Sequence, residues 1–218
     1  MTDSDDEIPQ LSESTMAALQ EFYAERQQRE EQISKTIING DSETSDNNVF
    51  DEDWQLSQFW YDDETVNTIT TAALNITNND GKIALISCPT LYRALKKDAG
   101  NRQIKIFEYD QRFSVYGSDF IPYDYNFPLH VPEEMSSGFD LVIADPPFLS
   151  EECLTKTTET IKFLSKKNIV LCTGALMADT AGRLLNVKKC DFQPHHKNNL
   201  ANEFSCFANF DFDASIKK

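Results

Sequence analysis

Residues 139–148 read FDLVIADPPF, an apolar run that ends in Asp145-Pro146-Pro147-Phe148. A short apolar run bounded by turn formers is typical of a strand buried on both faces of a parallel sheet. Two prolines cannot continue a central strand, because each fixes its φ angle and removes a backbone donor. The sequence therefore predicts a stiff turn at the carboxyl end of this strand, where open α/β sheets bind their ligands.

This turn offers hydrogen-bond acceptors followed by an aromatic ring. Asp145 supplies a carboxylate, the residues of the turn supply carbonyl oxygens, and the ring of Phe148 is able to cover a planar group or a cation. We expect such a turn to hold a nitrogen that carries N–H groups and to aim its lone pair. The candidate catalytic residues are therefore Asp145, Pro146, Pro147 and Phe148. The alternative is a Pro-Pro turn that only ends a strand, because a four-residue match is common by chance.

A second parallel strand is predicted upstream, over residues 82–86, with a helix from about Leu91. Between them lie Ser87, Cys88 and Pro89, and Pro89 suits the first turn of a helix. Free backbone N–H groups at a helix start bind anions, so these three residues are candidates for holding the carboxylate of a cofactor. Folds of this kind normally carry a glycine-rich turn here, and this chain has none.

The strand predicted over residues 104–110 ends in acidic residues. Glu108 lies 21 residues beyond Ser87, close to the offset of roughly 20 at which nucleotide-binding folds place an acid on the ribose hydroxyls. The alternative is a surface acid at a strand end. Asp110 is expected either to cap a helix or to support the residues of the site without contacting the ligand. Asp124 lies in the next turn.

The chain is expected to form one domain with an acidic N-terminal extension. Residues 1–32 form an acidic segment with a helix that starts at Ser12 or Ser14, residues 33–53 a flexible acidic linker, and residues 54–218 the domain. The N-terminal helix either folds back onto the domain or docks a partner. Both tryptophans lie in residues 54–61, ahead of a helix over about 62–77. This segment either packs the core or walls the cofactor pocket with Gln58, Trp60 and Tyr61.

Charge and cysteine content restrict the class of partner. The net charge is −16, and residues 1–53 hold 15 acidic and 3 basic residues, so the domain carries only −4. Nucleic-acid binders usually present a basic face, so a basic protein partner is favoured and nucleic acid is disfavoured. No apolar stretch approaches the roughly 20 residues of a membrane span, and the acidic N-terminus is unlike a secretory signal. Five cysteines without a C-x-x-C pair predict reduced thiols in a cytosolic or nuclear protein.

The rest of the chain continues the alternation of helices and strands. We expect a helix over 151–165, a strand over 168–173 and a helix over 177–185. Residues 190–193 and 204–210 then alternate like an antiparallel pair. The loop between them, residues 195–203, is either a plain polar loop or a loop that faces the substrate.

The acidic-Pro-Pro-aromatic turn resembles the amine-binding motif of class I S-adenosylmethionine-dependent methyltransferases that act on nitrogen. With the segments 54–61, 107–113, 149–154 and 199–204, it resembles the eukaryotic protein-lysine methyltransferases of translation elongation factor 1-alpha, formerly labelled adenine-specific DNA methyltransferases. The resemblance implies S-adenosyl-L-methionine as methyl donor, no metal, a cytoplasmic location and elongation factor 1-alpha as substrate; we expect a monomer. It also implies a Rossmann-like α/β fold, a seven-stranded, mostly parallel sheet with an antiparallel last strand and helices on both faces. The resemblance further implies that Asp124 accepts from an adenine amine, while the alternative is an ordinary turn.

Two other functions stay open at this point. One is an adenine-specific methyltransferase of nucleic acid, in which Phe148 stacks on a flipped base. The other is a non-catalytic binding module with the same fold, which the glycine-free turn at Ser87 would support.

Overall fold

A computed structural model describes residues 12–38, 50–198 and 200–217, in two compact units, residues 1–43 and 44–218. The described part of the first unit is one helix, α1 (Glu13–Ile38), whose start is capped by Ser12, since its Oγ accepts from the Thr15 N–H at 3.2 Å. The helix continues six residues beyond the predicted end at Gln32. Of the predicted linker, residues 39–49 lie outside the described residues. No helix in the described part of the chain is long and apolar enough to span a membrane.

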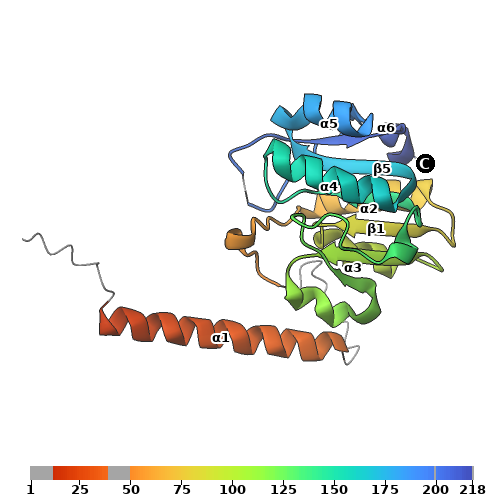
Figure 1. Cartoon of the computed structure of the whole chain (residues 1–218). Coiled ribbons are helices and arrows are strands. Elements are labelled where there is room, and N and C mark those ends of the chain that lie inside the picture. The colour runs from red at the N-terminus through yellow and green to blue at the C-terminus, as the bar shows by residue number, and fades with distance from the viewer. Residues whose placement is uncertain (1–11, 39–49, 199, 218) are drawn as a thin grey trace, which may run out of the picture. The chain divides into compact units, whose positions relative to one another are not determined.

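The second unit is built on a seven-stranded sheet in the order β3-β2-β1-β4-β5-β7-β6 (Figure 1). The strands are β1 (Lys82–Ile86), β2 (Gln103–Glu108), β3 (Phe120–Pro122), β4 (Phe139–Ala144), β5 (Ser165–Gly174), β6 (Lys188–Lys189) and β7 (Phe204–Ala208). Neighbours from β3 to β5 pair in parallel, and β7 runs antiparallel to both β5 and β6. The predicted Rossmann-like sheet with an antiparallel last strand is confirmed.

Helices cover both faces of this sheet, as Figure 1 shows. They are α2 (Asp63–Ile76), α3 (Thr90–Lys97), α4 (Glu151–Leu164), α5 (Ala178–Leu185) and α6 (Phe212–Ile216). Short 3-10 turns occur at η1 (Trp54–Leu56), η2 (Gln111–Asp119), η3 (Glu133–Met135) and η4 (Ala175–Met177). α2 packs against α3 and α6, and α4 packs against α5. Successive residues of β1 and β4 are buried on both sides, as a central parallel strand requires.

Two strand predictions were wrong in their bounds, and one strand was missed. β2 ends at Glu108, not at 110, because the Glu108 carboxylate accepts from the N–H groups of Tyr109 and Asp110 and the chain turns there. β3 was not predicted, since three residues ending in a proline carry no usable alternation. The strand predicted over 190–193 lies at Lys188–Lys189, because the N–H groups of residues 191 and 192 bond to Asp213 and leave the sheet.

Candidate functional site

One cavity of about 750 Å³ lies at the carboxyl ends of β1, β2 and β4. All the site residues predicted from the sequence line it: Gln58, Trp60, Tyr61, Ser87, Cys88, Pro89, Glu108, Asp124, Asp145, Pro146, Pro147 and Phe148. They come from five separate stretches of the chain, which the parallel sheet and the loops at its edge bring together. The roles assigned to them remain predictions.

Asp145 leaves β4 beside the end of β1, where its N–H donates to the Ile86 carbonyl at 3.0 Å. The side chain is half-buried, and the next residue, Pro146, is buried. The Tyr61 hydroxyl donates to Asp145 Oδ2 at 2.5 Å. Burial raises the pKa of Asp145 to about 7, and the hydrogen bond from Tyr61 opposes that rise. The carboxyl group therefore changes charge near neutral pH.

Phe148 stands at the mouth of the cavity with 43% of its surface exposed. Its ring meets the Tyr125 ring edge-on, at 5.8 Å between centroids. Ser150 caps α4 through the Cys153 N–H at 3.2 Å, which fixes where the turn ends. The acceptor turn is thus held by β4 on one side and by a capped helix on the other.

Glu108 is buried in the cavity wall, with 5% of its surface exposed. Its Oε1 accepts from the N–H groups of Tyr109 and Asp110, at 2.9 and 3.2 Å. Its Oε2 has no hydrogen-bond partner among the described residues. Burial raises the pKa of Glu108 to about 7. Because a buried acceptor without a partner is unfavourable, this oxygen fits a ligand hydroxyl such as those of a ribose.

Gln58 lines the cavity, but its side-chain amide is used in hydrogen bonds to Asp110 and Arg112. Its Nε2 donates to Asp110 Oδ2 at 3.0 Å, and its Oε1 accepts from Arg112 Nη2 at 3.1 Å. Arg112 also pairs with Asp110 at 2.7 Å. Burial disfavours the Asp110 charge, but hydrogen bonds from Arg112 and Gln58 outweigh burial and lower its pKa. The cluster fixes the segment before α2 against the end of β2, and Asp110 caps η2 as predicted.

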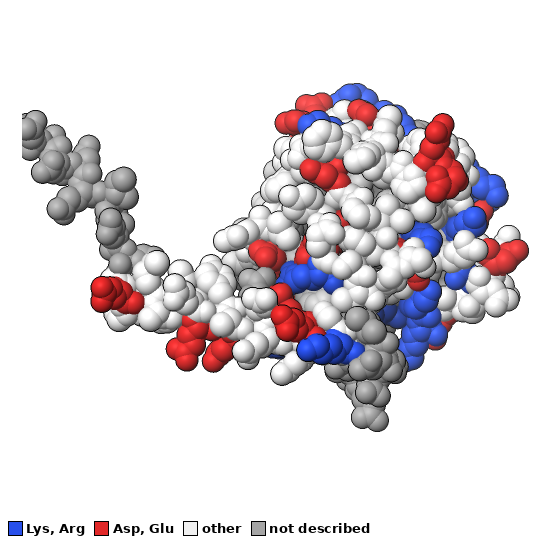
Figure 2. Space-filling view, turned by 60° about the horizontal axis from the view of Figure 1, so that its bottom comes forward, with Lys and Arg blue, Asp and Glu red and all other residues white. Residues whose placement is uncertain are grey.

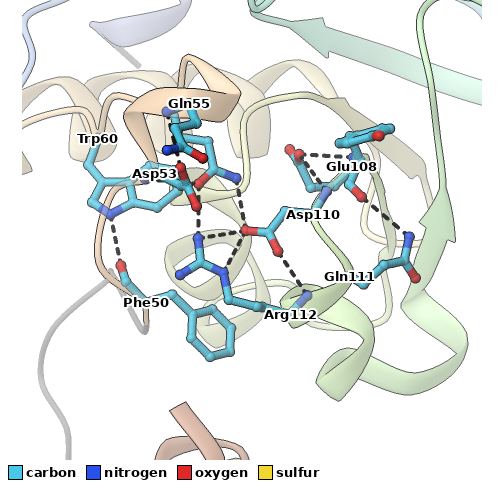
Figure 3. Close-up of polar contacts among 10 residues, drawn as sticks. Phe50, Asp53, Gln55, Trp60, Glu108, Asp110, Gln111 and Arg112 are labelled. Atoms are coloured by element: carbon cyan, nitrogen blue, oxygen red, sulfur yellow. Dashed lines mark hydrogen bonds and ion pairs between the residues drawn. The ribbon is translucent and has the colours of Figure 1, made fainter. Parts of the chain in front are cut away.

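Trp60 is buried and its indole Nε1 donates to the Phe50 carbonyl at 2.8 Å (Figure 3). Residues 54–61 therefore pack into the domain, and Gln58, Trp60 and Tyr61 also line the cavity, while their role as a wall of a cofactor pocket stays a prediction. Phe50 itself is buried, and so order begins within the segment predicted as linker.

The turn without glycine adopts a backbone conformation that favours glycine. Ser87 has a φ of 53°, in the left-handed region, and its N–H donates to the Phe107 carbonyl at 2.9 Å. The Cys88 thiol donates to the Ile143 carbonyl at 3.5 Å, and Cys88 lines the cavity. Pro89 lies at the N-cap position of α3.

Part of the loop over residues 195–203 also lines the cavity, and its role as a loop that faces the substrate stays a prediction. The backbones of His196 and Tyr61 form an isolated antiparallel β-bridge, and the centroids of their rings lie 5.1 Å apart. Burial lowers the pKa of His196 to about 4, so the ring is neutral at pH 7. The sequence-based candidates omit His196, Tyr125 and Asn202, which line the same cavity. Asn202 lies in the segment 199–204 that carries part of the resemblance, His196 lies in the polar loop, and Tyr125 follows Asp124, but no motif singles out these side chains.

The lining is acidic. It holds the carboxyl groups of Glu108, Asp124 and Asp145, and no Lys or Arg among the residues that the structure describes. Asp124 and Asn126 both line the cavity, and Asp124 accepts a hydrogen bond from the Asn126 N–H at 2.8 Å. Such a lining attracts a cation and repels a phosphate. Within the described ranges, no group of three or more His, Cys, Asp or Glu is arranged to hold a metal ion. All five cysteines are free and buried, as predicted.

Comparisons with known proteins agree on one family. A family profile described as "Probable N6-adenine methyltransferase" matches residues 52–212. The chain is 52% identical to chicken (Gallus gallus) "EEF1A lysine methyltransferase 1" over 212 residues, covering 96% of this chain and 98% of the relative. The human (Homo sapiens) protein of the same name is 50% identical, with 95% and 94% covered. In fold, a branched-chain polyamine synthase from Thermus thermophilus is similar, with a TM-score of 0.50, 11% identity, and 81% of this chain and 62% of that chain covered.

Proposed function

The chain belongs to the family of EEF1A lysine methyltransferases, and we propose that it transfers a methyl group from S-adenosyl-L-methionine to a lysine of translation elongation factor 1-alpha in the cytoplasm. The observation that carries the proposal is one acidic cavity that holds both the acceptor turn at Asp145–Phe148 and the unpartnered oxygen of Glu108. The first suits an amine and the second suits a ribose hydroxyl.

The residues of the cavity suit this cofactor. Glu108 would accept from the ribose hydroxyls, and the start of α3 at Pro89 would offer N–H groups to the carboxylate. Asp124 would accept from the adenine amine, and Trp60 would form part of the wall. When bound, S-adenosyl-L-methionine supplies an electrophilic methyl group on a positively charged sulfur.

A lysine must be deprotonated and oriented before it can accept a methyl group, and the turn at Asp145–Phe148 contributes to both. The ammonium group, with a pKa of about 10.4, must lose a proton, which costs about 4.6 kcal/mol at pH 7. Charge attraction to Asp145 brings the ammonium in, desolvation under Phe148 favours its neutral form, and the released proton passes to bulk water at the mouth of the cavity before the methyl is transferred. The carboxylate and the Pro146 carbonyl then accept N–H bonds and leave the lone pair free. Positioning of this kind contributes roughly 7–11 kcal/mol in well-oriented reactions.

Methylation of adenine in nucleic acid is the alternative that the family profile's description raises. The acidic lining disfavours it, because phosphate contacts supply much of the affinity for nucleic acid. On the face of the domain drawn in Figure 2, acidic and basic side chains occur together, with uncharged areas between them. The relatives at 50–52% identity are named as lysine methyltransferases.

The test is transfer of label from methyl-labelled S-adenosyl-L-methionine. Purified elongation factor 1-alpha and an adenine-containing oligonucleotide are offered separately to the full chain. We expect label in the protein, and a loss of at least about 100-fold for Asp145→Ala. Asp140→Ala is the matched control, because this carboxylate lies on the same strand but bonds to the Lys82 N–H and to Lys166. Label in the oligonucleotide and none in the protein contradicts the proposal.

A further inference from the structure

We propose that Tyr61 is a positioning residue for methyl transfer: its hydroxyl occupies one oxygen of the Asp145 carboxyl group, so that the other oxygen is left for the acceptor amine. The inference rests on the proposed function, in which Asp145 receives the amine. No described residue hydrogen-bonds to Asp145 Oδ1, whereas Oδ2 is taken by the Tyr61 hydroxyl at 2.5 Å. A carboxylate held at one oxygen cannot rotate freely, and its remaining acceptor has a fixed direction.

Tyr61 is held firmly enough to do this. Only 2% of its surface is exposed. Backbone hydrogen bonds on both sides fasten it to the loop at His196, since the Asp62 N–H donates to the His195 carbonyl and the Lys197 N–H to the Trp60 carbonyl. The His196 ring packs between Tyr61 and Phe204, at 5.1 and 4.7 Å. The position of the Tyr61 hydroxyl is therefore fixed by the loop at His196 as well as by the segment before α2.

The hydrogen bond also acts on the charge of Asp145. Burial favours the protonated carboxyl group, and the Tyr61 hydroxyl stabilises the ionised one and lowers its pKa. The thiols of Cys88 and Cys172 act on Tyr61, the His196 ring packs against it, and Glu108 acts on Cys88. His196 and Cys88 stay neutral near pH 7, because burial lowers the pKa of the ring and raises that of the thiol. Glu108 titrates in the same range as Asp145 and must be separated from it by experiment.

Three roles for Tyr61 predict different results. If it positions Asp145, removal of the hydroxyl raises the pKa of Asp145 and lowers kcat. If it walls the cofactor pocket, removal weakens cofactor binding and leaves that pKa unchanged. If it only packs, removal changes stability alone.

The first measurement needs neither substrate nor cofactor. The carboxyl carbons of the full chain, labelled at aspartate, are titrated by NMR, with Asp145→Asn to assign the signal and Glu108→Gln to remove the second titration. We expect Tyr61→Phe to raise the pKa of Asp145 by about one unit or more. Tyr92→Phe is the matched control, because that hydroxyl donates to Asp119 at 2.8 Å outside the cavity. An unchanged Asp145 titration in Tyr61→Phe overturns the proposal.

The second measurement is the pH profile of methyl transfer. We expect Tyr61→Phe to lower kcat by about tenfold or more, to move the acid limb to higher pH, and to change cofactor affinity less than threefold. If Tyr61→Phe does not fold, 3,5-difluorotyrosine at position 61 keeps the hydroxyl as a stronger donor and should move the acid limb to lower pH. Weakened cofactor binding with an unmoved acid limb overturns the proposal. If the wild-type chain methylates no elongation factor, the proposed function fails, while the NMR titration still decides the role of Tyr61.

Discussion

At the scale of the residue, Glu108 makes the most direct prediction about the cofactor. Glu108→Gln keeps an oxygen for the N–H groups of Tyr109 and Asp110 but replaces the unpartnered Oε2 with a donor. We expect the dissociation constant of S-adenosylhomocysteine to rise about 10- to 100-fold, as for loss of a hydrogen bond to a charged group. Calorimetry measures it, with the exposed Glu152→Gln as control. An unchanged dissociation constant for S-adenosylhomocysteine would show that Glu108 does not bind the cofactor.

The same carboxyl group predicts how stability depends on pH. Burial raises its pKa in the folded protein from the ordinary 4.5 to about 7, so between these values the folded chain binds more protons than the unfolded chain. The free energy of unfolding should therefore fall as pH rises from 4.5 to 7, by roughly 3 kcal/mol from this group. Asp145 acts in the same direction. Urea unfolding at pH 5 and pH 8 tests this, and Glu108→Gln should lose less stability over that range than the wild type.

Ser87 makes a prediction about strain. Its φ of 53° disfavours any side chain, and a β-branched one most of all. Ser87→Gly should leave the free energy of unfolding unchanged or raise it by up to about 1 kcal/mol, whereas Ser87→Val should lower it by about 2 kcal/mol. Ser136→Gly, at an ordinary φ of −56°, is the control and should lose about 0.5–1 kcal/mol. A loss in Ser87→Gly as large as in the control would show that the turn is not strained.

At the scale of the element, the sequence predicted what depends on local pattern. β1 and β4 are continuous apolar runs bounded by turn formers, and the structure has them at the predicted residues. The acceptor turn was predicted because two adjacent prolines restrict the backbone whatever surrounds them. β3 and β6 depend on pairing with distant strands and carry too few residues for a pattern. The contact between Tyr61 and Asp145 joins residues 84 positions apart, and nothing local in the sequence encodes it.

The end of β5 supports the acceptor turn, and this contact is testable. A Cβ added at Gly174 would lie 2.9 Å from Leu149 Cδ2, and Leu149 lines the cavity directly after Phe148. Because the end of the leucine side chain can move, Gly174→Ala should lower stability by less than about 2 kcal/mol while lowering kcat several-fold. Gly182→Ala in α5 is the control, since nothing lies nearer than 3.7 Å, and should be neutral or stabilising with kcat unchanged. Equal kcat in Gly174→Ala and Gly182→Ala would show that the position of Leu149 does not affect the turn at Asp145–Phe148.

At the scale of the whole molecule, the question is where the domain begins. The sequence placed its start at Trp54, but Phe50 is buried and contacts the Phe113 ring at 5.3 Å. Arg112 lies over the Phe50 ring at 5.4 Å, and Glu52 accepts from the Trp60 N–H at 2.8 Å. We propose that the domain starts at Phe50 or before. Phe50 contacts Arg112, which hydrogen-bonds to Gln58, so these contacts help to hold a residue that lines the cavity.

Two truncations test this boundary. A chain of residues 44–218 keeps every residue that lines the cavity, and we expect its melting temperature and S-adenosylhomocysteine affinity to match those of the full chain. A chain of residues 54–218 lacks Phe50 and Glu52, and we expect it to lose about 3–5 kcal/mol of stability, as for deletion of a buried aromatic side chain. Phe50→Ala in the full chain should reproduce most of that loss, because it leaves the Phe113 ring and the Arg112 guanidinium without their neighbour. If the shorter chain is as stable as the longer one, the segment before Trp54 is only a tether, as the amino-acid composition alone suggested.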